Sequence, residues 1–263
     1  MNKNHYTAIG LDKGEMHVYD FGNVKLHAYR TDDFINDEVF IVEKNGNAVV
    51  IESPCFFDNH SALQKYVADM NVKGMLIAYH DAGGKFLPNV RKYATENAKE
   101  YGEQGGGKAL IDNFTNAFGA IFDSSLHKIT DVIGEGKITI GGIEFEIIKT
   151  PDAYNIGIPE INAVYTHMLG HDCHSIVAGA NHADAMIAEL ESYIAKGYGL
   201  ILTSHYTPED LKDAETKISY LKELKSLAKT CQTAEEFKAE AEKRFPGYGG
   251  ENYLNMTANM FFA

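Results

Sequence analysis

Apolar and polar residues alternate in several short runs, and these runs come in pairs joined by residues typical of tight turns. Asn-Gly and Gly-Gly are favoured in two-residue hairpin loops because the backbone there adopts positive φ. The pattern therefore predicts three pairs of antiparallel strands. These pairs are 16–21 with 24–29 around Gly22-Asn23, 38–43 with 48–52 around Asn45-Gly46, and 137–140 with 143–149 around Gly141-Gly142.

Helical periodicity is clearest in residues 208–228, where apolar side chains recur at spacings of three and four. Thr207 is a candidate N-cap for this helix, and Pro208 suits its first turn. Thr233 opens a capping-box pattern for a last helix, which must end before Pro246. Shorter helices are predicted at 58–70, 96–118 and 182–196.

Two continuous apolar runs, 74–79 and 200–203, predict strands that are buried on both faces. Strands and helices alternate along the chain, and no internal repeat of fixed period is present. This order predicts a mixed α/β fold. We expect one domain over residues 1–263, with C-terminal helices from about residue 208.

Composition and charge narrow the class of protein. Hydrophobic residues make up 44% of the chain, and no run approaches the roughly 20 apolar residues of a membrane-spanning helix. The formal net charge of −13 repels phosphate backbones and anionic lipid, so we expect neither nucleic acid nor a membrane as partner.

The first ten residues lack the apolar stretch of a secretory signal, which favours a cytoplasmic protein. The cysteines show no C-x-x-C spacing, so neither a disulfide framework nor a zinc ribbon is indicated.

Histidines are concentrated near the carboxylates of the C-terminal half. Imidazole and carboxylate together are typical of a metal site with nitrogen and oxygen ligands. Three polar clusters follow predicted strands: His80-Asp81, the segment 171–174, and Ser204-His205-Tyr206. Because α/β proteins bind ligands at the carboxyl ends of strands, these clusters are expected to converge on one edge of a sheet.

At these residues the chain resembles the metallo-β-lactamase superfamily, which includes glyoxalase II and many other hydrolases. The resemblance rests on the early hairpin, on the second hairpin running into Lys149-Thr150-Pro151, and on the late strand that ends in a histidine. The segment 75–84 also keeps the glycines of the family motif T-H-x-H-x-D-H-x-G-G in register. The resemblance implies an α/β fold of four layers, an αββα sandwich in which two mixed β-sheets are flanked by helices.

The family's metal ligands are only partly present. Its first metal site uses three histidines, and the matching positions here are Leu76, Ala78 and Ala153, which have no lone pair to offer a cation. This chain is therefore similar to a divergent member whose motif is degenerate.

For the family's second metal site, the resemblance implies four ligands in this chain. His80 and Asp81 stand in swapped order, Asp172 is the candidate third ligand and His205 the fourth. Second-tier candidates are His171, His174 and His182. The implied cofactor is one divalent cation, zinc, iron or manganese, or none if the site is fully degenerate. His80 and Asp81 have a structural alternative as a loop pair in which Asp81 caps the turn at Gly83.

Two functions from different classes follow. In the first, a single metal activates water for attack on an ester, thioester or lactone, with His80 and Asp81 at the centre and Tyr206 orienting the substrate or stabilising the oxyanion. In the second, a metal-free descendant of the fold binds a small molecule or a protein partner without catalysis. A third interpretation builds a separate site from His167, His171, His174 and His182. The apolar residues 56–57 and 260–262 are candidates for the lining of a pocket or for a contact within a homo-oligomer.

Overall fold

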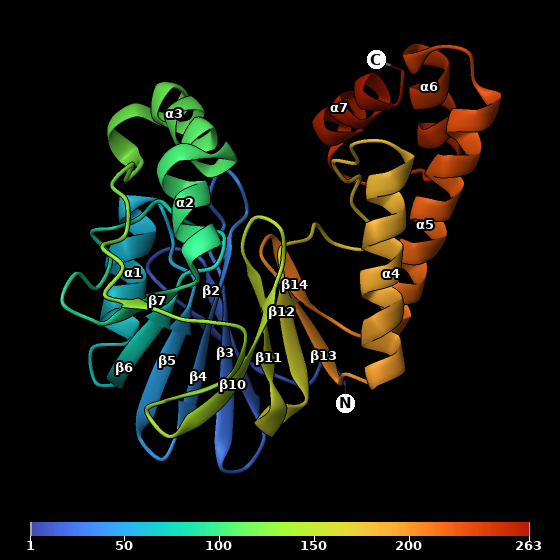
Figure 1. Ribbon diagram of the computed structural model, residues 1–263. Coiled ribbons are helices and arrows are strands. Elements are labelled where there is room, and N and C mark those ends of the chain that lie inside the picture. Colours follow the sequence, from blue (N-terminus) through green and yellow to red (C-terminus); the bar gives the residue numbers. More distant parts are fainter. Residues whose placement is uncertain (1, 263) are drawn as a thin grey trace.

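The computed structural model describes residues 2–262, and two β-sheets form its centre (Figure 1). Both sheets are mixed, because β5 to β8 run parallel in the first and β12 runs parallel to β13 in the second. The first sheet contains, in spatial order, β1 (Thr7–Gly10), β2 (Glu15–Asp20), β3 (Val24–Arg30), β4 (Glu38–Lys44), β5 (Asn47–Ile51), β6 (Asn71–Leu76), β7 (Lys92–Ala94) and β8 (Asp131–Val132). The second contains β14 (Tyr206–Glu209), β13 (Leu200–Thr203), β12 (Ala163–Thr166), β11 (Tyr154–Ile158), β10 (Ile143–Lys149) and β9 (Gly136–Ile140).

Helices cover the outer faces of both sheets and complete the four-layer sandwich. The described chain contains α1 (Phe57–Tyr66), α2 (Glu96–Gln104), α3 (Gly106–Phe118), α4 (Ala180–Lys196), α5 (Leu211–Thr230), α6 (Ala234–Arg244) and α7 (Glu251–Phe261), of which α1, α4 and α5 lie on the sheets. Helix α1 packs on the first sheet through Leu63, whereas α4 and α5 pack on the second through Ile187 and Leu221. The expected αββα architecture with two mixed sheets is confirmed (Figure 1).

The main core lies between the two sheets. Phe40 of β4 meets Tyr165 of β12 with ring centroids 5.9 Å apart, and both side chains are fully buried. A second core joins the C-terminal helices, where Phe237 contacts the rings of Phe261 and Phe262. Within residues 2–262, no helix combines the length and the apolar composition needed to cross a bilayer.

The three predicted strand pairs are present, and the turn of the second pair has positive φ at both Asn45 and Gly46. The long C-terminal helix begins later than predicted, at Leu211 rather than 208. Pro208 instead lies in β14, at the edge of its sheet, where its missing N–H costs no ladder hydrogen bond. Asp210 caps α5 by accepting hydrogen bonds from the amides of Lys212 and Asp213.

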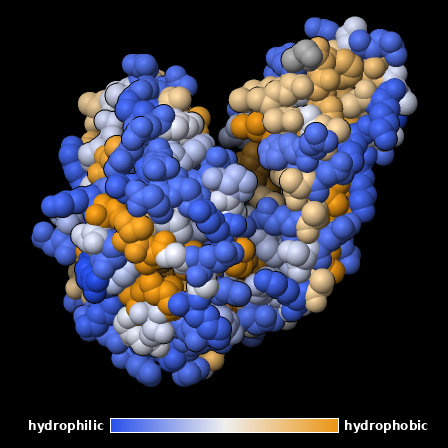
Figure 2. All heavy atoms as spheres, viewed as in Figure 1, coloured by the Kyte–Doolittle hydropathy of each residue, from blue (hydrophilic) through white to orange (hydrophobic). Residues whose placement is uncertain are grey.

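The predicted helix 96–118 is two helices, α2 and α3, which meet at Gly105. Thr233 caps α6, as predicted, but α6 is not the last helix, because α7 follows it. Figure 2 shows a recess in the surface between the part formed by α2 and α3 and the part formed by α4 to α7.

Candidate metal centre

Three histidines converge at one edge of the sandwich because of strand register. The parallel strands β12 and β13 pair Thr166 with Thr203, so His167 and His205 leave the second sheet side by side. The ring centroids of these two residues lie 5.0 Å apart, and that of His80 lies 5.6 Å from His205 and 6.0 Å from His167. One ring nitrogen from each histidine lies within 4.8 Å of the other two.

A carboxylate from the first sheet joins the histidines. Strand β4 is antiparallel to β5 with Phe40 opposite Ile51, so Asp37, just before β4, lies at the same edge. Its Oδ1 is 3.2 Å from His205 Nδ1 and 3.8 Å from His80 Nε2. We call Asp37, His80, His167 and His205 the Asp37 cluster.

Three potential ligand atoms of the Asp37 cluster make no hydrogen bond. Asp37 Oδ1, His80 Nε2 and His205 Nδ1 are all buried, and none makes a hydrogen bond of acceptable geometry. Within the described chain no Lys or Arg forms an ion pair with Asp37. Buried polar atoms are nearly always hydrogen-bonded, so three that face one another without hydrogen bonds are suited to bind a shared cation. Imidazole nitrogens with one carboxylate oxygen are a donor set that zinc, iron and manganese accept, so the residues fit a divalent cation.

The electrostatics of the cluster keep the Asp37 carboxyl group ionised. Burial raises the pKa of Asp37, but the imidazoles of His80 and His205 outweigh burial and hold the pKa below its ordinary value. Burial lowers the pKa of His80, and the charges of Asp37 and Glu52 overcome this effect and raise it. Asp37 is therefore an anion in the folded protein, available to bind a cation.

The far side of Asp37 is held in place by its own loop and by a thiol. Cys55 Sγ–H donates to Asp37 Oδ2 at 3.2 Å, which leaves Oδ1 facing the histidines. Asp33 Oδ1 accepts hydrogen bonds from the amides of Ile35 and Asp37. The amide of Glu38 then donates to the carbonyl of Ser204 at 2.7 Å, so the Asp37 loop is bonded to the loop of His205 on the other sheet.

The buried carboxylate of Glu52 organises the histidine loops. Its Oε1 accepts hydrogen bonds from the amide of Tyr79 at 2.8 Å and from Tyr165 Oη at 2.7 Å, and its Oε2 accepts from the amides of Ala78 and His80. Tyr165 Oη also contacts Ser204 Oγ at 2.9 Å. One side chain therefore connects the loops that carry His80 and His205.

His167 forms the open side of the cluster. It is the most exposed member, whereas Asp37 is 1% exposed. The Tyr79 ring stacks on the imidazole with centroids 4.7 Å apart, and Tyr79 Oη is held by Thr150 Oγ1 and Asn155 Oδ1. A substrate can therefore approach the cluster from the side of His167.

The positions of the family's first metal site are filled by the hydrophobic core. Leu76, Ala78 and Ala153 are almost completely buried and belong to the same cluster between the sheets. Tyr154, next to Ala153, is fully buried there as well. Apolar packing therefore occupies the place where the resemblance puts the first cation.

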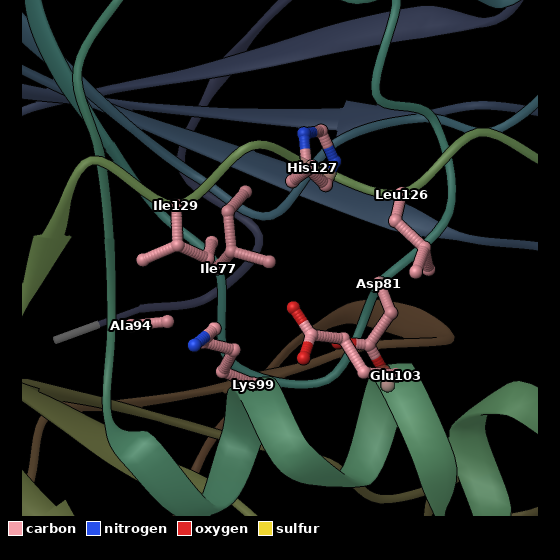
Figure 3. Close-up of a pocket in the computed structure, with 9 residues that line it drawn as sticks. Ile77, Asp81, Ala94, Lys99, Glu103, Leu126, His127 and Ile129 are labelled. Carbon is pink, nitrogen blue, oxygen red and sulfur yellow. The ribbon is translucent and has the colours of Figure 1, made fainter.

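Asp81 does not point toward the histidines. Its side chain lies against α2 near Glu103 (Figure 3), and a Cβ added at Gly102 would collide with its carboxyl group. Burial, together with the charges of Glu52 and Glu103, raises the pKa of Asp81 to about 8. The residue borders a cavity of about 10 Å³, which has room for about one water molecule.

Asp172 and Tyr206 also lie outside the Asp37 cluster. Asp172 is exposed and belongs to none of the groups of mutually close donor atoms found among residues 2–262. The Tyr206 ring packs on Gly170 and meets the His171 ring edge to face, with centroids 5.8 Å apart. Burial, together with the nearby charge of Asp172, raises the pKa of Tyr206. Of the four ligands implied by the resemblance, the structure thus brings together His80 and His205.

The second-tier histidines occupy three separate places. His171 lies between Glu209 and Asp213, and His174 Nδ1 is 3.1 Å from Tyr220 Oη in the helical core. His182 Nδ1 accepts a hydrogen bond from the amide of Ala178 at the start of α4. None of the three shares a group of close donor atoms with His167 in the described part of the chain.

Sequence reasoning did not single out Asp37. The predicted clusters consist of polar residues that follow strands, whereas Asp37 precedes β4. The signal that could have found it was the hairpin of β4 and β5, because the residue before β4 must lie next to the residues after β5. His167 was considered only as part of a different group.

No family model matches the chain, and no curated protein matches it. Solved structures do match. The chain is similar to the stereoselective inverting sec-alkylsulfatase from Pseudomonas sp., with a TM-score of 0.64 and 15% identity over 95% of this chain and 50% of that one. This chain therefore spans about half the length of the alkylsulfatase.

Two further structures match over most of their own length. A metallo-β-lactamase family protein from Thermus thermophilus gives a TM-score of 0.62 at 13% identity, over 91% of both chains. A metallo-β-lactamase from Erythrobacter litoralis gives 0.57 at 14% identity, over 82% of this chain and 100% of that one. Identities this low establish the fold alone. The protein therefore has the metallo-β-lactamase fold, in a sequence far diverged from these structures, as the resemblance of segment 75–84 implied.

Proposed function

We propose that this protein is a hydrolase that binds one divalent cation through Asp37, His80, His167 and His205. The observation that carries the proposal is the set of three buried donor atoms, Asp37 Oδ1, His80 Nε2 and His205 Nδ1, that face one another without hydrogen-bond partners. Burying a polar group without a hydrogen bond costs about 1–3 kcal/mol, and a cation bound by all three atoms offsets that cost.

A divalent cation supplies a Lewis acid that polarises a carbonyl group and lowers the pKa of water. The chain's own residues give the site its shape. Asp37 contributes the negative charge, Cys55 keeps its Oδ1 aimed at the imidazoles, and Glu52 fixes the backbone on which His80 stands. His167 lies at the solvent side, so it is the ligand nearest to an incoming substrate.

Charge favours a neutral substrate, namely an ester, thioester or lactone. Asp33, Asp37 and Glu52 gather at the site, and in the described chain none of them pairs with Lys or Arg. An anionic group that the cation does not itself bind would meet these carboxylates without a basic side chain beside it. The sec-alkylsulfatase with the same fold is named for a sulfate ester, so a sec-alkyl sulfate is the informative comparison substrate.

Elemental analysis of protein purified without chelator tests the proposal. We expect about one equivalent of zinc, iron or manganese per chain, and hydrolysis of p-nitrophenyl acetate, a thioester or a lactone that exceeds that of the sec-alkyl sulfate. His167→Ala is the most suitable variant, because the exposed ring can be removed without opening the core. It should lower both metal affinity and kcat/KM by at least about a hundredfold.

His182→Ala is the matched control, because this histidine lies at the surface of α4 away from the Asp37 cluster. It should keep full metal content and activity. Metal content below about a tenth of an equivalent in the wild-type protein would overturn the proposal.

The alternative is a metal-free protein that binds a small molecule or a protein partner, and the filled first site favours it. Leu76, Ala78 and Ala153 leave no ligands there. A chelator separates the two functions. A cation present at 100 times its Kd stabilises the fold by about 2.7 kcal/mol, so EDTA should lower Tm by about 5–10 °C if the metal is bound. An unchanged Tm supports the alternative.

A further inference from the structure

A polar groove lies between α2 and the loop that joins β10 to β11, and it has no role in the proposed chemistry. Its volume is about 440 Å³, within the range of pockets that hold small molecules. Two half-buried side chains, Asn97 and Tyr101, form its base. The rim is exposed and consists of Glu100, Gln104, Gly105, Pro151 and Asp152. We call it the α2 groove, and the surface over α2 is mostly hydrophilic (Figure 2).

Hydrogen bonds and close packing fix the base of the α2 groove. Asn97 Nδ2 donates to the carbonyls of Thr150 and Ala153, each at 2.9 Å, and so ties α2 to the loop. The Tyr101 ring lies against the junction of α2 and α3, where a Cβ added at Gly106 would be 2.9 Å from it. A ligand therefore does not have to order these side chains, which removes one of the costs of binding.

Tyr79 links the α2 groove to the open side of the Asp37 cluster. Its ring stacks on the imidazole of His167, and its Oη lies 3.0 Å from Thr150 Oγ1. Thr150 begins the loop whose next two residues, Pro151 and Asp152, form one wall of the groove. A substrate that approaches the cluster from the side of His167 can therefore extend past Tyr79 into the groove.

The charged side chains that line the α2 groove are both acidic. Glu100 lies on α2 and Asp152 on the opposite loop, and among the described residues no lysine or arginine lines the groove. Lys149 precedes the loop but is not part of the lining. Lys99 of α2 and Lys108 of α3 each pair with a carboxylate of their own helix. The groove therefore repels anions and attracts cations.

The uncharged groups at the base of the α2 groove also suit a cation. Asn97 directs its Nδ2 to the loop, and its buried Oδ1 accepts no hydrogen bond. Burial and the charges of Asp152 and Asp81 raise the pKa of Tyr101, so its phenol ring stays neutral. The face of such a ring attracts ammonium and guanidinium groups. Two carboxylates, an acceptor without a donor and an aromatic face together recognise a group that carries N–H donors and a positive charge.

We infer that the α2 groove binds a positively charged group of the substrate, a primary ammonium or a guanidinium, while the bond to be hydrolysed lies at the Asp37 cluster. The inference rests on the proposed function and narrows its substrates to esters, thioesters or lactones with a remote basic group. The bond that is cleaved remains neutral, as the carboxylates of that cluster favour. Glu100 and Asp152 are then specificity-determining residues.

Binding of ω-aminoalkyl hydroxamic acids to the zinc-loaded protein, measured by calorimetry, tests this inference. The hydroxamate group binds the metal, and the ammonium group probes the α2 groove. Each probe is compared with the n-alkyl hydroxamic acid that carries a methyl group in place of the ammonium. At the chain length that reaches from the metal to the groove, the ammonium should improve affinity about tenfold, whereas shorter chains should show no preference.

The double variant Glu100→Gln, Asp152→Asn should bring the two affinities within about twofold of each other and leave acetohydroxamate binding unchanged. Both side chains are exposed, so their replacement does not disturb the core. Asp69→Asn is the matched control, because Asp69 is an exposed carboxylate between α1 and β6, at the opposite end of β6 from His80. It should keep the full preference for the ammonium.

Three outcomes would overturn the inference. If both series bind equally at every chain length, the inference is wrong and the metal site stands. A preference that survives in the double variant would show that the ammonium binds elsewhere. If no hydroxamate binds, the proposed function fails and the inference fails with it.

Discussion

Two groups of histidine and carboxylate lie in this molecule, and their surroundings differ. In the Asp37 cluster the donor atoms face one another without hydrogen bonds. In the second group, which we call the His171 cluster, His171 lies between Glu209 and Asp213. Here His171 Nδ1 is 2.8 Å from Glu209 Oε1, Asp213 Oδ2 accepts from the amide of Asp210, and Lys3 pairs with Asp213.

The difference lies in how charge and hydrogen bonds are balanced. The His171 cluster has a lysine partner, and within residues 2–262 none of its buried polar atoms is unpaired. The Asp37 cluster has neither a lysine nor an arginine among the described residues. Residue types are alike in both clusters, so composition does not separate a metal centre from a structural network. Unpaired lone pairs separate them, because only those atoms gain from a cation.

Zinc affinity should give the largest contrast between the two clusters. Asp37→Asn keeps the shape of the side chain and removes its charge, so we expect the affinity to fall by more than about a hundredfold. Asp213→Asn makes the same change in the His171 cluster and should alter the affinity by less than about threefold. Competition with a chromophoric chelator measures both. Equal losses in the two variants would show that the comparison is wrong.

The free energy of unfolding should give the second-largest contrast, between Glu52 near the Asp37 cluster and Glu209 in the His171 cluster. Each carboxylate oxygen of Glu52 accepts two hydrogen bonds. In Glu52→Gln one of these oxygens is replaced by an NH₂ group, which then faces two hydrogen-bond donors in either orientation of the amide. We expect a loss of about 2–3 kcal/mol in the free energy of unfolding. The hydrogen bonds of Glu209 converge on Oε1, so Glu209→Gln can keep them through its amide oxygen and should lose less than about 1 kcal/mol. Urea unfolding measures the loss in each variant. A larger loss for Glu209→Gln than for Glu52→Gln would contradict the prediction.

The smallest predicted effect is a pH dependence of the His171 cluster. The hydrogen bond to Glu209, together with the charges of Glu209 and Asp213, raises the pKa of His171. A histidine with a raised pKa contributes stability that is fully present below its unfolded pKa of about 6.5 and is lost as pH rises through the folded pKa. His171→Ala should therefore cost about 1 kcal/mol more at pH 5.5 than at pH 9. Thermal unfolding at both pH values measures this, and a cost that grows with pH would contradict the assignment.

Much of the fold could be read from local patterns. The Asn45-Gly46 turn and the alternating residues on either side predicted β4 and β5, because positive φ and a period of two are local properties. The start of α5 could not be placed in this way. Pro208 suits a first helical turn and an edge strand equally well, and only its position beside β13 decides between them.

The candidate site, like the fold, was predicted from the sequence only in part. The chain alone determined that imidazoles follow two buried strands, and that the first-site positions of the resembled family hold Leu76, Ala78 and Ala153, which cannot bind a cation. Tertiary structure alone decided that Asp37 joins His80 and His205 while Asp81 turns toward α2. The physical reason is that adjacent residues such as His80 and Asp81 direct their side chains differently, and that Asp37 reaches the cluster through pairing between strands.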